Sequence, residues 1–264
     1  MSPTLVLLLV WSGSAMVMAA VWALAMRVRN LGYVDVAWAG LMATSALFVG
    51  AFGEGAELPR GLTALFGSVW GTRLCLHLLV RVLHEPEDGR YQALRARWPD
   101  SPGRFFLFFQ AQAVVVALFA LPFLAAASRH DNTCSLTTWL AILVWLAGLG
   151  GESLADRQLA TFRANPDNRG KTCRRGLWAW SRHPNYFFEW LHWFAYVLLA
   201  LGGDRVWLSL IGPLLMFAFL YRVSGIPWTE AQSLRSRGDD YRRYQQEVNA
   251  FFPWPPRRNA SGVA

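Results

Sequence analysis

The chain has 264 residues, of which 54% are hydrophobic and 16% are charged, and it contains 14 Trp and 17 Phe. Soluble domains carry about 25% charged residues, so this composition excludes an ordinary soluble protein and indicates a polytopic membrane protein. The net charge of +8 does not indicate nucleic-acid binding, because the basic residues lie between apolar runs and not along one face or tail. Cys75, Cys134 and Cys173 lack metal-ligand spacing, so we expect no metal site.

Apolar runs of about 20 residues, the length that crosses a hydrocarbon core, recur along the chain. They predict an all-α fold, a bundle of seven transmembrane helices at about residues 4–26, 32–52, 62–83, 105–127, 138–160, 186–203 and 206–226. The first run has its basic residues after it, which favours a retained span over a secretory signal. We predict one membrane domain over residues 1–264, with substrate-side helices in 1–104 and the main cofactor loops in 105–264.

The loops differ in their arginine content. One set of loops carries Arg60, Arg129 and Arg205, and the other carries Arg27, Arg29, clusters within 90–104 and 163–182, and the C-terminal Arg257 and Arg258. The positive-inside rule then places the C-terminus in the cytoplasm and the N-terminus in the periplasm of a bacterial inner membrane, or in the lumen of a eukaryotic compartment. After the last span, the polar run 229–247 predicts a surface helix, and the prolines within 251–256 exclude helix there.

Asp35, in LGYVDVAWAG, is an ionisable residue at the start of an apolar span. Such residues are costly in a membrane and mark candidate functional groups. The side chain could be an interfacial carboxylate at a helix N-terminus. Alternatively, it faces a cavity, where burial would favour a protonated carboxyl that hydrogen-bonds or protonates a substrate carbonyl.

Arg73 shares one helical stripe with His77 and Arg81, and we expect this stripe to face the bundle interior. A purely structural ion pair with a buried acid would explain Arg73 equally well. In the following loop, Arg90 begins a basic turn that fits either a phosphate clamp or contact with anionic lipid.

A polar, arginine-rich block at residues 155–190 separates two apolar spans, a place where a membrane enzyme can hold its cofactor. Glu152 and Asp156 share a helical face, and Arg163 follows Asp156 by two helical turns. This alignment suits the ribose and phosphates of an adenine nucleotide, although a salt-bridged helix end has the same pattern. The other cations of the block that could neutralise phosphates are Arg169, Lys171, Arg174, Arg175 and Arg182.

Three segments, ADRQLATFRANPDNRG, GLWAWSRHPNYFFEW and YRRYQQEVNAFFPWPP, resemble the steroid 5-alpha-reductase family in its bacterial membrane branch. The resemblance covers most of the chain. It implies a seven-helix bundle that binds NADPH at cytoplasmic loops and reduces the C4–C5 double bond of a 3-oxo-delta-4 steroid or a similar hydrophobic enone. Hydride transfer to the beta carbon would leave an enolate, which an acid at the carbonyl oxygen would stabilise.

The resemblance also implies residue roles. Asp156 and Arg163 match the acid and arginine that hold the adenine nucleotide, and Asn185 and Glu189 match the pair that approaches the nicotinamide. Asp35 takes the place of a family glutamate that contacts the substrate carbonyl. Arg73 and Arg90 are expected to contact the phosphates, and Tyr33 is expected to be the catalytic partner of Asp35. Trp38 and Trp70 are expected in the substrate pocket, and Trp70 lies nearest the position of the family's tyrosine.

The segment RHPNY at 182–186 also resembles membrane methyltransferases of the isoprenylcysteine and phospholipid type, which use S-adenosylmethionine. We favour the reductase because S-adenosylmethionine is cationic and requires no arginine cluster, whereas a 2′-phosphate and a pyrophosphate do. A lipid-binding scaffold without chemistry would not explain the mixture of acids and arginines. We expect the protein to contact membrane lipid and to function as a monomer.

Overall fold

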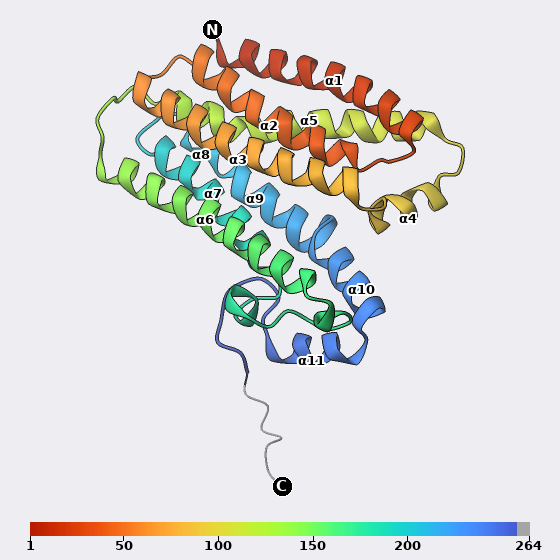
Figure 1. The fold of residues 1–264 in the computed structure, drawn as a ribbon. Coiled ribbons are helices and arrows are strands. Elements are labelled where there is room, and N and C mark those ends of the chain that lie inside the picture. The colour runs from red at the N-terminus through yellow and green to blue at the C-terminus, as the bar shows by residue number, and fades with distance from the viewer. Residues whose placement is uncertain (258–264) are drawn as a thin grey trace. The chain divides into compact units, whose positions relative to one another are not determined.

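The computed structural model describes residues 1–257, and all regular elements in this range are helices (Figure 1). Arg258, one of the C-terminal arginines used to predict orientation, lies outside the described residues. The α-helices are α1 (Pro3–Val28), α2 (Tyr33–Phe52), α3 (Glu57–His84), α4 (Gly89–Arg97), α5 (Pro102–Ala127), α6 (Leu136–Ala164), α7 (Pro184–Ala200), α8 (Val206–Ser209), α9 (Ile211–Ala218), α10 (Ile226–Arg237) and α11 (Asp239–Glu247). Three short turns complete the set: η1 (Pro166–Asn168), η2 (Gly176–Ala179) and the π-helical η3 (Phe219–Val223).

Within residues 1–257, six helical segments are long and apolar enough to cross a membrane. Five of them are α1, α2, α3, α5 and α6, and the sixth is the segment Val206–Arg237, which contains α8 to α10. The predicted span at 186–203 does form a helix, α7, but α7 has 17 residues and is shorter than these six. The all-helical fold and the membrane-spanning composition are therefore confirmed, and the count of seven spans stays a prediction.

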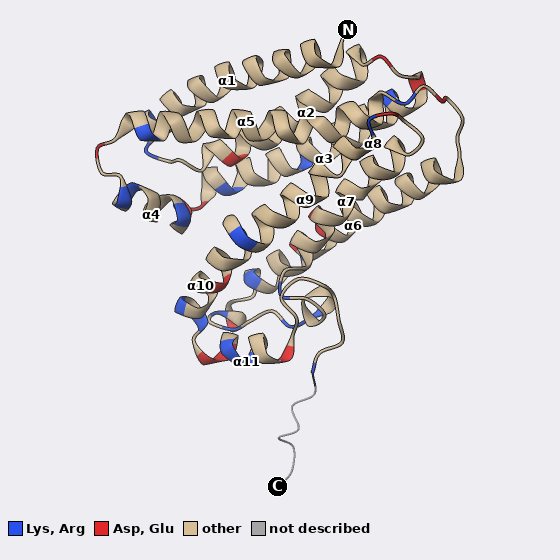
Figure 2. Ribbon diagram, turned by 180° about the vertical axis from the view of Figure 1, so that it is seen from behind, with Lys and Arg blue, Asp and Glu red and all other residues tan. Residues whose placement is uncertain are grey.

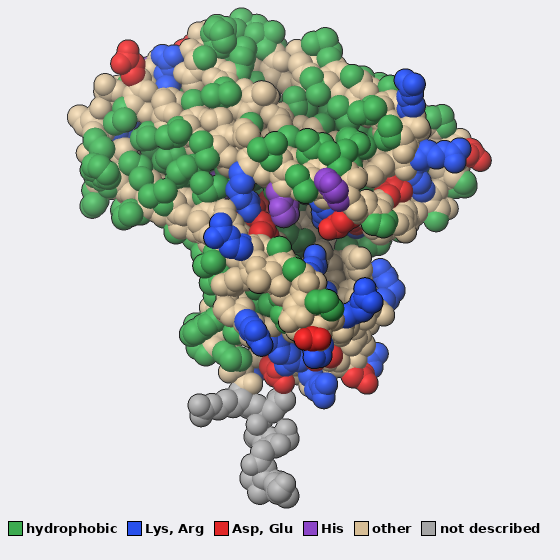
Figure 3. All heavy atoms as spheres, viewed as in Figure 1, with side chains coloured by type: hydrophobic (Ala, Val, Ile, Leu, Met, Phe, Trp, Pro, Cys, Tyr) green, Lys and Arg blue, Asp and Glu red, His purple; other side chains and the backbone are tan. Residues whose placement is uncertain are grey.

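The chain folds into two compact units. Unit 1 contains Met1–Ala141 and Tyr196–Gly212, and unit 2 contains Ile142–Ala195 and the chain from Pro213 onward. Figure 3 shows hydrophobic side chains over much of the molecule, and Figure 2 shows Lys and Arg around α4, in the loop after α6 and on α10 and α11. Each unit thus carries its own polar region.

Unit 1 is built on the pairing of α2 with α3. In this unit α1 packs against α2 and α5, and α5 packs against α2, α3 and α8. Small residues bring α2 and α3 into close contact: a Cβ on Gly67 would lie 2.3 Å from the Ala46 Cβ, and one on Gly71 would lie 2.8 Å from the backbone nitrogen of Ala43. Side chains projecting from α2 and α3 are therefore held on a closely packed scaffold.

Unit 2 uses the same device between α6 and α7. A Cβ on Gly148 would lie 2.6 Å from the His192 Cβ, and one on Gly151 would lie 2.3 Å from the Phe188 ring. The indole Nε1 of Trp190 on α7 donates to the carbonyl of Pro213 on α9 at 3.0 Å. The polar residues of α6 and α7 are thereby fixed relative to one another.

The segment after η3 differs from the single surface helix predicted for 229–247. Two helices, α10 and α11, replace it, because Gly238 between them has φ +54, a left-handed conformation that glycine adopts without steric cost. Residues 251–256 are not helical, as the prolines predicted. The Tyr244 hydroxyl donates to the carbonyl of Trp178 at 2.5 Å, and the Ser181 hydroxyl donates to the carbonyl of Phe251 at 2.8 Å. This C-terminal segment is therefore tied to the loop that precedes α7.

Candidate functional sites in the two units

In unit 1, Asp35 on α2 accepts hydrogen bonds at both carboxylate oxygens. The Tyr91 hydroxyl donates to Oδ1 at 2.7 Å, and the Arg90 guanidinium donates to Oδ2 at 3.1 Å. The Asp35 side chain is 33% exposed and is therefore accessible from outside this group. A carboxylate that accepts at both oxygens from a guanidinium and a phenol has the hydrogen-bonding pattern of the ionised form.

The short helix α4 supplies both partners of Asp35. It begins at an Asp88 cap, whose Oδ1 accepts from the backbone N–H of Arg90 at 2.9 Å and from the Arg90 Nε at 3.1 Å. Arg81 at the end of α3 pairs with the other Asp88 oxygen at 2.5 Å. Burial acts to raise the pKa of Asp88, but the charge and hydrogen bonds of Arg90 outweigh it and lower the pKa. Asp88 is thus an anion that orients Arg90 toward Asp35.

Tyr91 is buried and remains a hydrogen-bond donor over a wide pH range. Burial raises the pKa of its phenol well above the usual value, and the negative charge of Asp35 raises it further. Burial opposes the charge of Arg90, but the neighbouring carboxylates Asp35 and Asp88 raise the pKa of its guanidinium. A neutral phenol and a cationic guanidinium therefore flank the carboxylate.

Two sequence expectations change in this group. Tyr33 precedes Asp35 by two positions, or about 200° around a helix, and Tyr91 is the tyrosine that hydrogen-bonds to Asp35. Arg90, expected at a cofactor phosphate, pairs instead with Asp35 and Asp88. No local sequence signal connects Tyr91 with an acid 56 positions away.

A small cavity adjoins the group, lined by Asn30, Gly32, Asp35, Leu78, Arg81, Val82, Pro86, Glu87, Asp88 and Tyr91. Its volume of about 20 Å³ is enough for about one water molecule, which needs roughly 10–15 Å³. The Asp35–Tyr91 pair therefore has room beside it for a single small polar group.

The two tryptophans predicted in the substrate pocket lie together in unit 1. The Trp38 ring meets the Trp70 ring edge to face at 6.1 Å and the Phe119 ring at 5.6 Å. Within residues 1–257, the Trp38 indole N–H is buried without a hydrogen-bond partner. Trp38 follows Asp35 by one turn of α2 and is partly exposed, whereas the Trp70 and Phe119 rings that it meets are buried in the core of unit 1. Arg73 lies one turn beyond Trp70 on α3.

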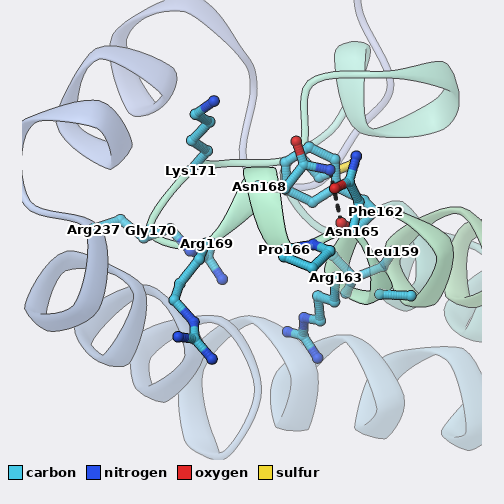
Figure 4. Close-up of a pocket in the computed structure, with 12 residues that line it drawn as sticks. Leu159, Phe162, Arg163, Asn165, Pro166, Asn168, Arg169, Gly170, Lys171 and Arg237 are labelled. Carbon is cyan, nitrogen blue, oxygen red and sulfur yellow. Dashed lines mark hydrogen bonds between the residues drawn. The ribbon is translucent and has the colours of Figure 1, made fainter.

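Unit 2 contains a basic cavity of about 320 Å³ at the end of α6 (Figure 4). Its lining residues are Leu159, Phe162, Arg163, Ala164, Asn165, Pro166, Asn168, Arg169, Gly170, Lys171, Cys173 and Arg237. Four of these are cations, and the described lining includes no carboxylate. Figure 4 shows the guanidinium groups of Arg163 and Arg169 extending to one side of the loop and the Lys171 side chain extending to the other. We call this feature the basic cavity.

The loop that forms the basic cavity follows from its sequence, ANPDNRGK. Asn165 caps η1 by accepting from the backbone N–H of Asp167 at 3.0 Å, and the Asn168 side chain donates to the carbonyl of Phe162 at 2.8 Å. Gly170 has φ +75, so the chain turns there in a conformation that other residues adopt only with strain. The turn places Arg169 and Lys171 on either side of one glycine at the cavity.

Asp156 and Asn185 lie together between α6 and α7, as the resemblance implied. The Asn185 side-chain amide donates to Asp156 Oδ1 at 3.3 Å, and its own Oδ1 is buried with no hydrogen-bond partner within residues 1–257. Glu152 precedes Asp156 by one turn of α6, and Glu189 follows Asn185 by one turn of α7. Arg163 lies two turns beyond Asp156, which connects this polar pair with the basic cavity along a single helix.

The basic cavity contains Arg237, which the sequence did not suggest, in place of Arg174, which it did. Arg174 forms ion pairs with Glu247 and with Asp240, the latter at 3.3 Å, and lies over the Tyr244 ring, so it joins the preceding loop to α11 and does not line the basic cavity. Arg237, in the last turn of α10, lines the cavity although it lies outside the arginine-rich block. The sequence offered no signal for Arg237 beyond its charge at a helix C-terminus.

Residues 21–248 match the family model described as "Protein of unknown function (DUF1295)". The chain belongs to the DUF1295 family. This family is related to steroid 5-alpha-reductase-like proteins. The match extends through both units and contains the Asp35–Tyr91 pair, the Asp156–Asn185 pair and all four cations of the basic cavity.

The chain is also 24% identical to an uncharacterized protein of Schizosaccharomyces pombe in an alignment of 267 positions. The alignment covers 88% of this chain and 75% of the yeast protein. No solved structure has significant similarity to this chain.

Proposed function

We propose that the protein is an NADPH-dependent reductase that reduces the double bond of a hydrophobic enone such as a 3-oxo-delta-4 steroid. The observation that carries the proposal is the basic cavity, which combines Arg163, Arg169, Lys171 and Arg237 and has no carboxylate in its described lining. NADPH carries a 2′-phosphate and a pyrophosphate, and guanidinium groups bind phosphates through paired hydrogen bonds. The relation of the family to steroid 5-alpha-reductase-like proteins supports the same conclusion.

The basic cavity and Asn185, both in unit 2, have charges and hydrogen-bonding groups suited to NADPH. The cavity volume of about 320 Å³ falls at the lower end of the roughly 300–1,000 Å³ typical of ligand pockets. The buried Asn185 Oδ1, which lacks a partner within residues 1–257, is an acceptor suited to a carboxamide N–H. Asp156 fixes the other end of the same side chain. We propose that Asn185 binds the nicotinamide amide and that the cations bind the phosphates.

When bound, NADPH would supply the hydride that adds to the beta carbon of the enone. That addition moves negative charge onto the carbonyl oxygen of the substrate, where a donor stabilises it. We propose Tyr91 as this donor, because its phenol is neutral and its O–H can rotate about the C–O bond from Asp35 to a carbonyl oxygen. Before substrate binds, the hydrogen bond to Asp35 would hold the phenol in place, and the bond from the phenol to the substrate oxygen would then replace it.

The partly exposed Trp38 ring, backed by the buried rings of Trp70 and Phe119, would form the surface that receives the flat, apolar body of the substrate. The Trp38 indole N–H, buried without a partner among the described residues, is a donor for an oxygen of such a molecule. An enone with an extended hydrocarbon skeleton therefore suits the composition of this surface better than a small polar substrate does.

The first test is a thermal-shift titration of the detergent-purified chain with NADPH, NADH and S-adenosylmethionine. A ligand that binds only the native state raises its stability by about 2.7 kcal/mol at 100 times its Kd. NADPH should raise the unfolding midpoint more than NADH does, because only NADPH carries the 2′-phosphate. The midpoint should then be compared in Arg169→Ala and in Arg242→Ala, a change at an arginine of α11 outside the cavity. Stabilisation by S-adenosylmethionine without stabilisation by NADPH would overturn the reductase in favour of the methyltransferase.

A further inference from the structure

Three aromatic side chains of unit 2 are exposed next to one another, and we call them the aromatic patch. They are Trp180, Phe252 and Trp254, which are 48%, 50% and 65% exposed. The backbone N–H of Trp254 donates to the carbonyl of Trp180 at 2.9 Å, so the C-terminal segment and the loop before α7 present their aromatic residues together. Single exposed aromatic residues are common, but three of them on two adjoining backbone segments indicate a contact surface.

The aromatic patch continues the apolar surface of a candidate membrane span. The Phe252 ring lies 5.7 Å from Trp190 on α7 and 6.4 Å from Phe217 on α9. Helix α9 belongs to the span Val206–Arg237, where Leu214 is also exposed. Phe251, the neighbour of Phe252, is buried against the same helices and anchors the segment. The exposed aromatic side chains thus extend a surface that is already suited to lipid.

The backbone of this segment is suited to a weakly hydrated environment. Residues 252–256 are not helical, and non-helical backbone near a membrane is costly because its N–H groups lack partners. Three of these five residues, Pro253, Pro255 and Pro256, have no N–H to satisfy. The N–H of Trp254 is already bonded to Trp180. Few donors are therefore left that would require water.

The charge pattern around the aromatic patch matches a lipid headgroup region. Residues 248–256 contain no charged side chain, and the exposed Arg257 follows directly. Trp favours the membrane–water boundary because its ring is apolar and its N–H is polar, and arginine next to such a residue attracts anionic headgroups. A protein partner would not need a surface continuous with a membrane span.

From these observations we infer that the aromatic patch is an interfacial anchor that inserts Trp180, Phe252 and Trp254 into the headgroup region of the bilayer. The anchor is joined to the loop before α7 by the bond from Arg182 N–H to the Asn249 carbonyl at 2.9 Å and by the Ser181–Phe251 bond. Lipid contact at the patch would thereby fix the depth of the loop that leads from the basic cavity to α7. The inference is independent of the cofactor and of the reaction.

The test uses spin labels on the full chain in phosphatidylcholine–phosphatidylglycerol nanodiscs. Cys134 is exposed and is replaced by Ser, and the chain without an added cysteine gives the background. Single cysteines for labelling are introduced by Trp254→Cys and Phe252→Cys, and by Arg242→Cys on α11, where the arginine side chain is 70% exposed, as the matched control. The measurement is the ratio of collision with oxygen, which partitions into lipid, to collision with a water-soluble nickel chelate.

Labels at positions 254 and 252 should give oxygen-to-nickel ratios severalfold higher than the label at 242, each measured on a labelled chain that still shows a cooperative unfolding transition. A water-like ratio at both 254 and 252 would overturn the anchor. If Trp254→Cys fails to fold, Phe252→Cys alone decides between these outcomes, because its ratio must still exceed that at 242.

Discussion

The Tyr91 phenol donates a hydrogen bond of 2.7 Å to Asp35 Oδ1, although the two residues are 56 positions apart in the sequence. Three features produce this contact. Asp35 lies in the first turn of α2, and the Asp88 cap fixes the residue at which α4 begins. Arg90 then pairs with the carboxylates of both Asp35 and Asp88. The cap and the ion pairs therefore position the Tyr91 phenol, the proposed donor to the substrate oxygen, against the Asp35 carboxylate.

Replacing Tyr91 with Phe should reduce enone turnover by about 100-fold or more while leaving NADPH affinity unchanged. A positioned acid typically contributes about 10²–10⁴-fold to a rate, and the substitution removes only the hydroxyl. Turnover is followed by NADPH oxidation in detergent micelles, and affinity by nucleotide fluorescence. The control is Tyr33→Phe, which removes a hydroxyl from the same unit but not from the Asp35 hydrogen bonds. Equal losses in the two variants would remove Tyr91 from the mechanism.

Asp35→Asn separates the charge of the acid from its shape. The amide would still accept one hydrogen bond, but it would no longer balance Arg90. We expect turnover to fall below detection and bound nucleotide to remain, because the cations of the basic cavity belong to unit 2. Retention of full activity, measured in the same NADPH oxidation assay, would exclude Asp35 from the reaction.

The elements that could be predicted from sequence are those with local signals. An acid in an apolar run indicated Asp35 as a candidate, and an arginine-rich block between two apolar spans indicated Arg163, Arg169 and Lys171, which line the basic cavity. Local spacing could not identify Tyr91 or Arg237, because each reaches its site from another helix. It also could not show that Arg90 and Arg174 are neutralised by carboxylates distant in sequence or on other helices, such as Asp35 for Arg90 and Glu247 for Arg174.

The same limit applies to the helices. The hydropathy pattern predicted the long helices because burial in lipid and in a core both select apolar residues. It did not predict the break at Gly238, which depends on one left-handed residue within a polar run. The short length of α7 agrees with the prediction, because the apolar run at 186–203 is the shortest of the seven.

Replacing Arg169 or Lys171 with Ala should weaken NADPH binding by roughly 10- to 100-fold. A hydrogen bond to a charged group contributes about 1.5–3 kcal/mol, and about 1.4 kcal/mol corresponds to a tenfold change in Kd. The NADPH Kd of each variant is measured by titration at low and high salt, and its salt dependence should also decrease. Arg242→Ala, outside the cavity, should leave the Kd within twofold. An unchanged NADPH affinity in both cavity variants would contradict the proposal that these cations bind the NADPH phosphates.

Asp88→Ala should lower the free energy of unfolding by about 1–2 kcal/mol. The substitution removes a helix cap, which is typically worth about 0.5–2 kcal/mol, and leaves Arg90 with one carboxylate in place of two. Asp88→Asn retains an oxygen that can cap α4 and should recover part of this loss. The unfolding midpoints of both variants in detergent are compared with that of the unaltered chain. Equal midpoints in all three would show that α4 does not depend on its cap.

His183 should make the stability of the protein depend on pH below neutrality. Its ring is buried, stacks on Tyr186 at 5.3 Å and lies 3.3 Å from Glu230 Oε1. Burial lowers the pKa of His183 below its ordinary value of 6.5, the Arg182 charge lowers it further, and Glu230 opposes the shift without reversing it. In the pH range between the folded-state pKa and 6.5, the unfolded chain therefore binds the proton more readily than the folded chain does.

The sign of the effect follows from this difference. The contribution of His183 to the free energy of unfolding is complete above pH 6.5 and is lost as the pH falls through the folded-state pKa, with a slope of at most about 1.4 kcal/mol per pH unit for one proton. Unfolding midpoints are compared at pH 7.5 and 5.5 for the unaltered chain, for His183→Gln, and for His130→Gln, which changes an exposed histidine. The first and third should lose stability on acidification, and His183→Gln should lose less. His183 is buried and its pKa is lowered. If the loss of stability on acidification were the same in all three proteins, groups other than His183 would be responsible for it.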